Sequence, residues 1–248
     1  MSTLESVIQT DPTPSGRRKV RAAAVAVGLL ISALIFSTIT GVIALIPVFM
    51  LELDFMSAPV VSGLLIAGQL GFLVVAYLYA RRYDLRVPIA LPTRSDLGYT
   101  VGGVIAALVV ATAVTSALDQ IGLLPESVFE DLAVADPMVL IALAVLSVVV
   151  IAPVEEYLFR GVIQGRLRRS FGAIGAIFGA SLLFGALHVP NYGGTALAIV
   201  SGALLIATVG VVFGILYERT ANLVVPVTAH AVYNVVLFVG TYYWYWVL

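Results

Sequence analysis

Three short patterns of polar residues interrupt the apolar second half of this sequence. Each pattern pairs residues four positions apart, which places them on one face of a helix. The patterns are Glu155-Glu156 with Arg160, Phe184 with His188, and His230 with Asn234. A carboxylate and an imidazole can activate water, while a second imidazole and an amide can donate hydrogen bonds to an oxyanion on a carbonyl group. These residue types therefore indicate a hydrolytic site.

The two neighbouring glutamates differ in what they can reach. Glu156 and Arg160 share a helix face and can form an ion pair. Glu155 is rotated by ~100° from its neighbour and can point elsewhere. One carboxylate can thus be neutralised while the other stays available for chemistry. Pro153, which precedes the pair, is expected to kink the helix and open space there.

The composition indicates that these residues lie in a membrane. The chain has 248 residues, of which 61% are hydrophobic and 11% are charged, and its mean hydropathy is +1.08. Long apolar runs of this kind indicate membrane spans. Charged groups inside a span cost about 2.5–3.5 kcal/mol each on insertion scales, so they are expected to face a polar interior. Cysteine is absent, which excludes disulfides, a thiolate nucleophile and a cysteine-type zinc site.

The apolar runs predict an all-α fold, a polytopic transmembrane helical bundle of about seven spans, with six or eight as alternatives. A span needs ~20 helical residues to cross the hydrocarbon core. The expected spans are 22–51, 58–80, 97–118, 138–165, 172–188, 194–217 and 222–246. Residues 1–21 are expected to be a disordered cytoplasmic tail, and residues 22–248 a single transmembrane domain. The first apolar run is too long for a signal peptide, so we expect a retained helix.

The basic residues predict the orientation of these spans. Of the thirteen basic residues, all except Arg160 lie before the first span or in the loops that follow the second, fourth and sixth spans. The loops that follow the first, third and fifth spans contain no Lys or Arg. The positive-inside rule then places the N-terminus in the cytoplasm and the C-terminus outside. One lysine against twelve arginines, in a chain rich in Ala, Val and Gly, hints at a GC-rich prokaryotic genome. We therefore expect a multi-pass protein of a prokaryotic cell membrane.

The three polar patterns are expected to meet at one depth. The fourth and fifth spans form a hairpin, and folding the chain about the turn near Gly172 sets Glu155 level with His188, at ~1.5 Å per residue. The number of residues between His230 and the loop that contains Arg219 is about the same as the number between Glu155 and the loop that contains Arg166. Three separate patterns at the same depth favour one shared site.

Each pattern also has a structural interpretation. A lone histidine on an apolar helix is most often a hydrogen-bonding residue that joins helices, and Glu156 with Arg160 is equally suited to a structural ion pair. Phe184 is suited to packing or to a pocket wall. Asn234 can simply bridge helices, which is worth ~0.6 kcal/mol on average. The common depth of both histidines and the glutamates favours a functional site over these separate explanations.

Two chemistries are open to such a site. A carboxylate can act as general base while a histidine orients the water. Alternatively, Glu155, His188 and His230 can bind zinc or another divalent metal with one open position. The sequence lacks H-E-x-x-H, G-x-S-x-G and an intramembrane aspartate pair, which weakens the common zinc-protease, serine and aspartyl mechanisms.

In this order and spacing, E-E-x-x-x-R, F-x-x-x-H and H-x-x-x-N resemble the CPBP family of intramembrane proteases. That family includes the type II CAAX prenyl endopeptidases and the Abi proteins of bacteriocin immunity. The resemblance covers about residues 138–240, whereas the first three spans carry no motif of the family.

The resemblance also implies a role for each residue. Glu155 would act as the general base together with His188. His230 and Asn234 would stabilise the oxyanion. Glu156 would support the site through Arg160, and members of the family are described either as metalloproteases or as glutamate-dependent, metal-free proteases. We prefer the metal-free route, because three or four metal ligands cannot be assigned without using up the general base.

The predicted function is an intramembrane endopeptidase that uses activated water to hydrolyse a peptide bond in a membrane-associated or lipidated, CAAX-like substrate. We expect the cleavage to take place near the cytoplasmic side. The expected partners are membrane lipid and a membrane-bound or lipidated peptide or protein, and no nucleic acid. The oligomeric state is left open.

Two other classes of function also fit the sequence. A non-catalytic immunity or scaffold protein with the same fold would not need Glu155 or His188. A proton-coupled transporter could use the same carboxylates and histidines as a relay. Against a transporter, the intramembrane polar residues all lie in the second half of the chain, and no inverted repeat relates the two halves.

Overall fold

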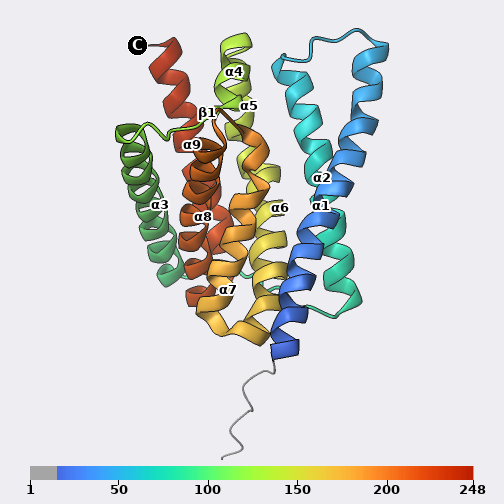
Figure 1. The fold of residues 1–248 in the computed structure, drawn as a ribbon, viewed down its shortest axis with the longest axis vertical. Coiled ribbons are helices and arrows are strands. Elements are labelled where there is room, and N and C mark those ends of the chain that lie inside the picture. Colours follow the sequence, from blue (N-terminus) through green and yellow to red (C-terminus); the bar gives the residue numbers. More distant parts are fainter. Residues whose placement is uncertain (1–15, 248) are drawn as a thin grey trace, which may run out of the picture.

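Long apolar runs form the helices of the bundle, because a helix satisfies its own backbone hydrogen bonds in lipid. The computed structural model describes residues 16–247, and within them six helices are long and apolar enough to cross a membrane (Figure 1). These are α1 (Gly16–Met50), α2 (Ala58–Arg82), α3 (Arg94–Gln120), a continuous stretch from Met138 to Leu187, α8 (Ala196–Thr220) and α9 (Val224–Trp246). The predicted all-α, polytopic fold is confirmed.

The first helix begins earlier in the sequence than expected. Residues 1–15 of the tail that we predicted over 1–21 lie outside the described part of the chain. Residues 16–21 instead begin α1, which makes this helix 35 residues long. Ile31, Ile35 and Phe49 are among its many exposed apolar side chains, as expected for a helix that faces lipid.

The stretch from Met138 to Leu187 reverses direction at Gly172. Its consecutive parts are α5 (Met138–Leu146), η1 (Ser147–Ile151), α6 (Ala152–Glu156), η2 (Tyr157–Gln164) and α7 (Gly165–Leu187). Gly172 has φ 69° and ψ −176°, which is not helical. The rings of Phe159 and Phe184, one on each arm, then come within 5.1 Å of each other. The two arms are the predicted fourth and fifth spans, so the described residues pass through the bundle seven times.

The helix around Pro153 is widened on both sides. The segments η1 and η2 are π-helices and flank the short α6 that carries Pro153 and both glutamates. Proline has no backbone N–H to donate, which removes one α-helical hydrogen bond at this point. The distortion that we predicted from Pro153 therefore takes the form of π-helical turns, which occur frequently at functional sites.

The loops that contain basic residues lie together at one end of the bundle. The backbone N–H of Leu223 donates to the carbonyl of Pro88 at 2.9 Å, which joins the loop before α3 to the loop before α9. Arg168, close to the turn at Gly172, pairs with Glu218 near the end of α8. The start of α1 lies at this same end, as Figure 1 shows.

The opposite end carries no Lys or Arg in its loops. There β1 (Glu126–Ser127) pairs antiparallel with β2 (Tyr192–Gly193), and α4 (Val128–Ala135) follows β1. Asp136 accepts a hydrogen bond from the backbone N–H of Ala58 at 2.7 Å, which caps α2. The C-terminus lies at this end, opposite the start of α1 (Figure 1).

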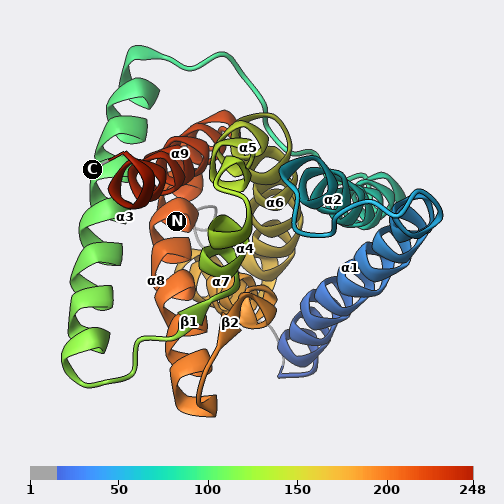
Figure 2. The ribbon, with the colours of Figure 1, turned by 90° about the horizontal axis from the view of Figure 1, so that it is seen from above.

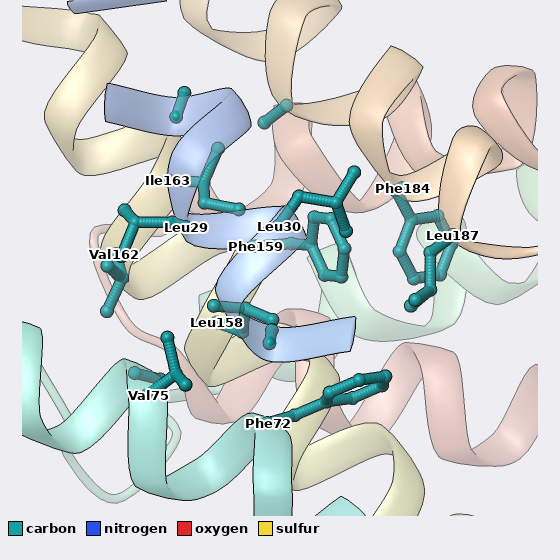
Figure 3. Close-up of a cluster of buried hydrophobic side chains, with 14 of the residues drawn as sticks. Leu29, Leu30, Phe72, Val75, Leu158, Phe159, Val162, Ile163, Phe184 and Leu187 are labelled. Atoms are coloured by element: carbon teal, nitrogen blue, oxygen red, sulfur yellow. The ribbon is translucent and has the colours of Figure 1, made fainter. Parts of the chain in front are cut away.

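Seen from above, α5 to α9 form a central group of helices (Figure 2). The pair α1 and α2 lies on one side of this group, and α3 lies on the other. One buried apolar cluster joins α1 and α2 to η2 and α7. The members labelled in Figure 3 are Leu29, Leu30, Phe72, Val75, Leu158, Phe159, Val162, Ile163, Phe184 and Leu187. Gly71 allows α2 to approach α1 closely, since a side chain there would collide with the backbone of Ser37. The first two spans are thus packed firmly against the segment that carries the glutamates.

The reversal at Gly172 yields a prediction about stability. A residue with a side chain costs ~1–3 kcal/mol in this region of backbone space, which is nearly exclusive to glycine. Gly172→Ala should therefore lower the free energy of unfolding in detergent micelles by that amount. Gly41→Ala is the matched control, because Gly41 is helical and a Cβ added there would meet no atom within 4 Å. Equal stability of the two variants would contradict the assignment of the turn to Gly172.

Candidate active site

A cavity of about 450 Å³ lies among the central helices and brings most of the predicted residues together. Its walls include Glu155 from α6, His188 at the end of α7, and His230 and Asn234 from α9. Most of the remaining wall is apolar or aromatic and comes from α1, α2, α5, α8 and α9. Examples are Leu34, Phe72, Leu143, Phe213 and Phe238. The convergence predicted from three sequence patterns is therefore present in the folded chain.

The cavity extends toward the end of the bundle whose loops contain no Lys or Arg. Ser127 and Phe129 border it from the segment that includes β1, and Pro190, Asn191 and Tyr192 border it from the segment that includes β2. Burial in this position raises the pKa of Tyr192 to about 12. The cavity thus lies away from the basic end, near which we expected the substrate to be cleaved.

Glu156 does not line the cavity but holds the residues that surround it. Its Oε2 is 3.2 Å from Nε of Arg160, and its Oε1 is 3.0 Å from Nδ1 of His230. Arg160 also donates from Nη2 to the carbonyl of Gly210 at 2.9 Å. Both members of the Glu156–Arg160 pair are fully buried. The predicted ion pair is confirmed, and it joins α6 and η2 to α8 and α9.

Aromatic rings fix the two histidines. The imidazole of His230 stacks on the ring of Phe213 at 4.9 Å, with 19° between the planes. Phe184 meets His188 edge-on at 4.7 Å and His230 edge-on at 5.8 Å. The guanidinium carbon of Arg160 lies 4.7 Å from the centre of the Phe184 ring, a cation–π contact. Phe184 is therefore both a wall of the cavity and a contact of three polar residues.

Hydrogen bonds to Nδ1 leave Nε2 of each imidazole for chemistry. Nδ1 of His188 lies 2.8 Å from the carbonyl oxygen of Phe184. Because a carbonyl only accepts, Nδ1 carries the proton, and the Nε2 of a neutral ring can accept one. The same reasoning applies to Nδ1 of His230 beside the carboxylate of Glu156.

Glu155 is the carboxylate that faces the cavity. It is 5% exposed, and its Oε1 accepts a hydrogen bond of 2.9 Å from Nε2 of Gln69 on α2. Its Oε2 is buried and has no hydrogen-bond partner among the described residues. The expected division of the two glutamates is present: Glu156 is neutralised by its neighbours, and Glu155 retains a free oxygen at the cavity.

Asn234 presents its amide to the cavity from α9. Its Nδ2 donates to the hydroxyl of Ser147 at 3.3 Å, and Ser147 is fully buried on η1. An amide nitrogen has two hydrogens, so one remains for a ligand in the cavity. Ser147 thus orients the amide and was not identified from the sequence.

Polar residues continue from the site to the basic end at intervals of four. Gln164 donates from Nε2 to the carbonyl of Gly214 at 3.1 Å and to Glu218 at 3.2 Å. Arg168 pairs with the other oxygen of Glu218 at 2.7 Å. Together with the bond from Arg160 to Gly210, these contacts form a polar ladder that joins η2 and the start of α7 to α8. The spacing Glu156, Arg160, Gln164, Arg168 was a signal for this ladder that the sequence analysis did not use.

Gln69 is the principal site residue that the sequence analysis missed. It is buried in the middle of α2, where its neighbours are apolar or glycine. The expectation that the intramembrane polar residues all lie in the second half of the chain was therefore wrong. A single amide in the middle of an apolar span was the signal, because burying an amide without a partner is costly.

The alternative set of metal ligands is not assembled. Within residues 16–247, no group of three or more His, Asp or Glu side chains is arranged to hold a metal ion. This includes Glu155, His188 and His230, although all three border the cavity. The donor set in this arrangement does not fit a bound metal, so we derive no step through one.

Fold and site together define a multi-pass membrane protein with a buried carboxylate and two imidazoles at one cavity. Residues 137–236 match the family described as type II CAAX prenyl endopeptidase Rce1-like, which confirms the resemblance to the CPBP family. This part of the chain, which carries all three polar patterns, is an Rce1-like domain.

The other comparisons add one partial relative. Over 86 residues the chain is 36% identical to the uncharacterized protein YpbD of Bacillus subtilis (strain 168), a region that makes up 35% of this chain. The aligned part covers 39% of YpbD, so the chain spans about two fifths of the length of this relative. No solved structure matches the chain.

The buried ion pair yields a second prediction. Arg160→Met should lower the free energy of unfolding by about 3–5 kcal/mol, because it leaves the carboxylate of Glu156 buried without its main counter-charge. Arg168→Met is the matched control, since Arg168 is 60% exposed and its pair with Glu218 is worth ~0–1 kcal/mol. Unfolding titrations in detergent measure both. A loss from Arg160→Met no larger than that of the control would show that Glu156 is not a buried charge.

Proposed function

We propose that this protein is an intramembrane endopeptidase in which Glu155 activates the water that attacks a peptide carbonyl. The observation that supports this most directly is the free, buried Oε2 of Glu155 at a cavity that two imidazoles and an amide also line. General bases, proton acceptors and oxyanion donors are the groups that hydrolysis of an amide requires. The Rce1-like domain supports a protease of the CAAX type at the level of the family.

Each residue has one task in the proposed reaction. Glu155 takes a proton from water as the water oxygen bonds to the peptide carbon. Nε2 of His188, on the same cavity, can hold the proton that Glu155 takes. The amide of Asn234 donates to the oxygen of the carbonyl as that oxygen becomes negative. As the intermediate collapses, the proton passes to the leaving nitrogen and the C–N bond breaks.

His230 can take part in the oxyanion site only in one protonation state. Its Nδ1 already faces Glu156, so Nε2 donates to an oxyanion only when the ring carries both protons. The carboxylate of Glu156 at 3.0 Å balances the charge of that ring. Glu156 and Arg160 thus support the reaction from outside the cavity.

The substrate in this proposal is a membrane-associated or lipidated peptide. A cavity with largely apolar walls favours a ligand with apolar groups, and its few polar side chains converge where the peptide bond would lie. The description of the family as a CAAX prenyl endopeptidase supports a CAAX-like, lipidated substrate. No step of the proposal uses a metal.

The proposal is tested with purified protein in liposomes and a fluorogenic, lipid-anchored peptide. Glu155→Gln keeps the shape of the side chain but removes the base, so the turnover rate should fall by about 10²–10⁴-fold. Asn234→Ala should lower kcat by about 10²–10³-fold with little change in KM, because the lost bond forms only as charge develops. The same peptide without its lipid measures the contribution of the anchor.

Asp119→Asn is the matched control for the loss of a carboxylate, because Asp119 is exposed and remote from the cavity. It should cleave at the wild-type rate. Full turnover by Glu155→Gln would disprove the assignment of the base. A wild-type protein that cleaves none of the membrane peptides would favour a non-catalytic immunity or scaffold protein.

We also propose that the basic end of the bundle lies in the cytoplasm and the C-terminus outside. The support is the segregation of every basic residue except Arg160 to one end, together with the positive-inside rule. The cavity would then extend toward the outer side of the membrane.

This orientation can be tested directly because the chain has no cysteine. Leu91→Cys introduces an exposed thiol at the basic end, and Val134→Cys introduces one on α4 at the opposite end. A membrane-impermeant maleimide added to intact cells should label Val134→Cys only. Lysed cells serve as the control, in which both are labelled, and the reverse pattern in intact cells would overturn the orientation.

A further inference from the structure

Gln69 contributes to the candidate active site from outside the Rce1-like domain. It lies on α2, whereas the domain comprises residues 137–236. Its side chain is 7% exposed, borders the cavity and donates from Nε2 to Oε1 of Glu155 at 2.9 Å. An ionised carboxylate only accepts hydrogen bonds, so it requires the amide to present Nε2 in this direction. The orientation of the Gln69 amide is therefore set by Glu155.

Two buried oxygen atoms on this joined pair have no partner among residues 16–247. They are Oε1 of Gln69 and Oε2 of Glu155. Buried acceptors of this kind are normally satisfied, and leaving them without a donor is costly in an apolar environment. The pair therefore offers two acceptors at the wall of a cavity that is large enough for water.

One water molecule carries enough hydrogens to donate to two acceptors at once. A water has two hydrogens, and when both are donated to the oxygens on one side, its lone pairs point the other way. Gln69 and Glu155 line the same cavity as His188 and Asn234. A water held in this way has its nucleophilic lone pair aimed at the substrate and one hydrogen already bonded to the base.

We propose that Gln69 is a catalytic residue that, together with Glu155, holds and orients the attacking water. The inference rests on the proposed peptidase function and deepens it. As the water oxygen bonds to the peptide carbon, one proton passes to Oε2 of Glu155, and the other hydrogen remains on the attacking oxygen and hydrogen-bonded to Oε1 of Gln69. The electron pair of the carbonyl double bond moves to the carbonyl oxygen. On collapse, the C–N bond breaks, the proton returns from Glu155 to the nitrogen, and an acid and an amine are released.

The test compares Gln69→Met with Leu70→Met in the liposome assay. Methionine has nearly the length of glutamine but forms neither hydrogen bond, so kcat should fall by about 10²-fold while KM changes by less than about twofold. Leu70 is the next residue on α2 and is exposed, so Leu70→Met should have wild-type kcat and KM. If Gln69→Met does not fold, Gln69→Asn withdraws the amide by one methylene and should show the same loss of kcat at unchanged KM.

A double variant separates catalysis from a merely structural role. If Gln69 acts on the same water as Glu155, Gln69→Met in a Glu155→Gln background should slow single-turnover cleavage by less than about twofold. A further 10²-fold loss in that background would overturn the inference, as would a higher KM at unchanged kcat. An active wild type with fully active Gln69→Met overturns this inference alone. A wild type that cleaves no peptide overturns the proposed function and this inference with it.

Discussion

The buried carboxylate of Glu156 is the constraint on which the rest of the site depends. It lies in an apolar bundle with Arg160 on one oxygen and His230 on the other, and both Glu156 and Arg160 are shielded completely from solvent. A charge in this position is tolerated only when its partners are held in place, since the cost of desolvation is high. The backbone carbonyl of Gly210 and the ring of Phe184 hold Arg160, and Phe213 holds His230. Balancing one charge thus fixes α6, η2, α7, α8 and α9 relative to one another.

Once Glu156 is fixed, the adjacent carboxylate is aimed at the cavity. Consecutive helical residues point in different directions, so the neighbour that turns away from Arg160 must find another environment. Glu155 finds it at a wall made by α2, which reaches the site because Gly71 allows close contact with α1 and the shared apolar cluster holds the pair against η2. The first two spans therefore complete the site, although they carry no motif of the family. The Rce1-like domain supplies the histidines, and the N-terminal helices supply part of the environment of Glu155.

The polar ladder that joins η2 and the start of α7 to α8 links this buried centre to the basic end of the bundle. Gly210 and Gly214 bring the backbone of α8 close enough to accept hydrogen bonds from Arg160 and Gln164. Helices in lipid gain little from apolar contact with one another, so small residues and interhelical hydrogen bonds determine which faces meet. The same ladder that neutralises Glu156 thereby sets the register of α8 against η2, and with it the position of Phe213 beside His230.

Local sequence was sufficient to determine the spans, the hairpin, the pairing of Glu156 with Arg160 and the common depth of Glu155 with both histidines. These features depend on hydrophobicity, on a spacing of four residues and on the rise of a helix, all of which are encoded within one segment. Tertiary structure alone decided that Gln69 bonds Glu155 across 86 positions, that β1 pairs with β2, and that the cavity extends away from the basic end. These features depend on which helix faces pack together. In an apolar bundle the packing is determined by contacts between distant segments, so the sequence of one segment is not enough to predict it.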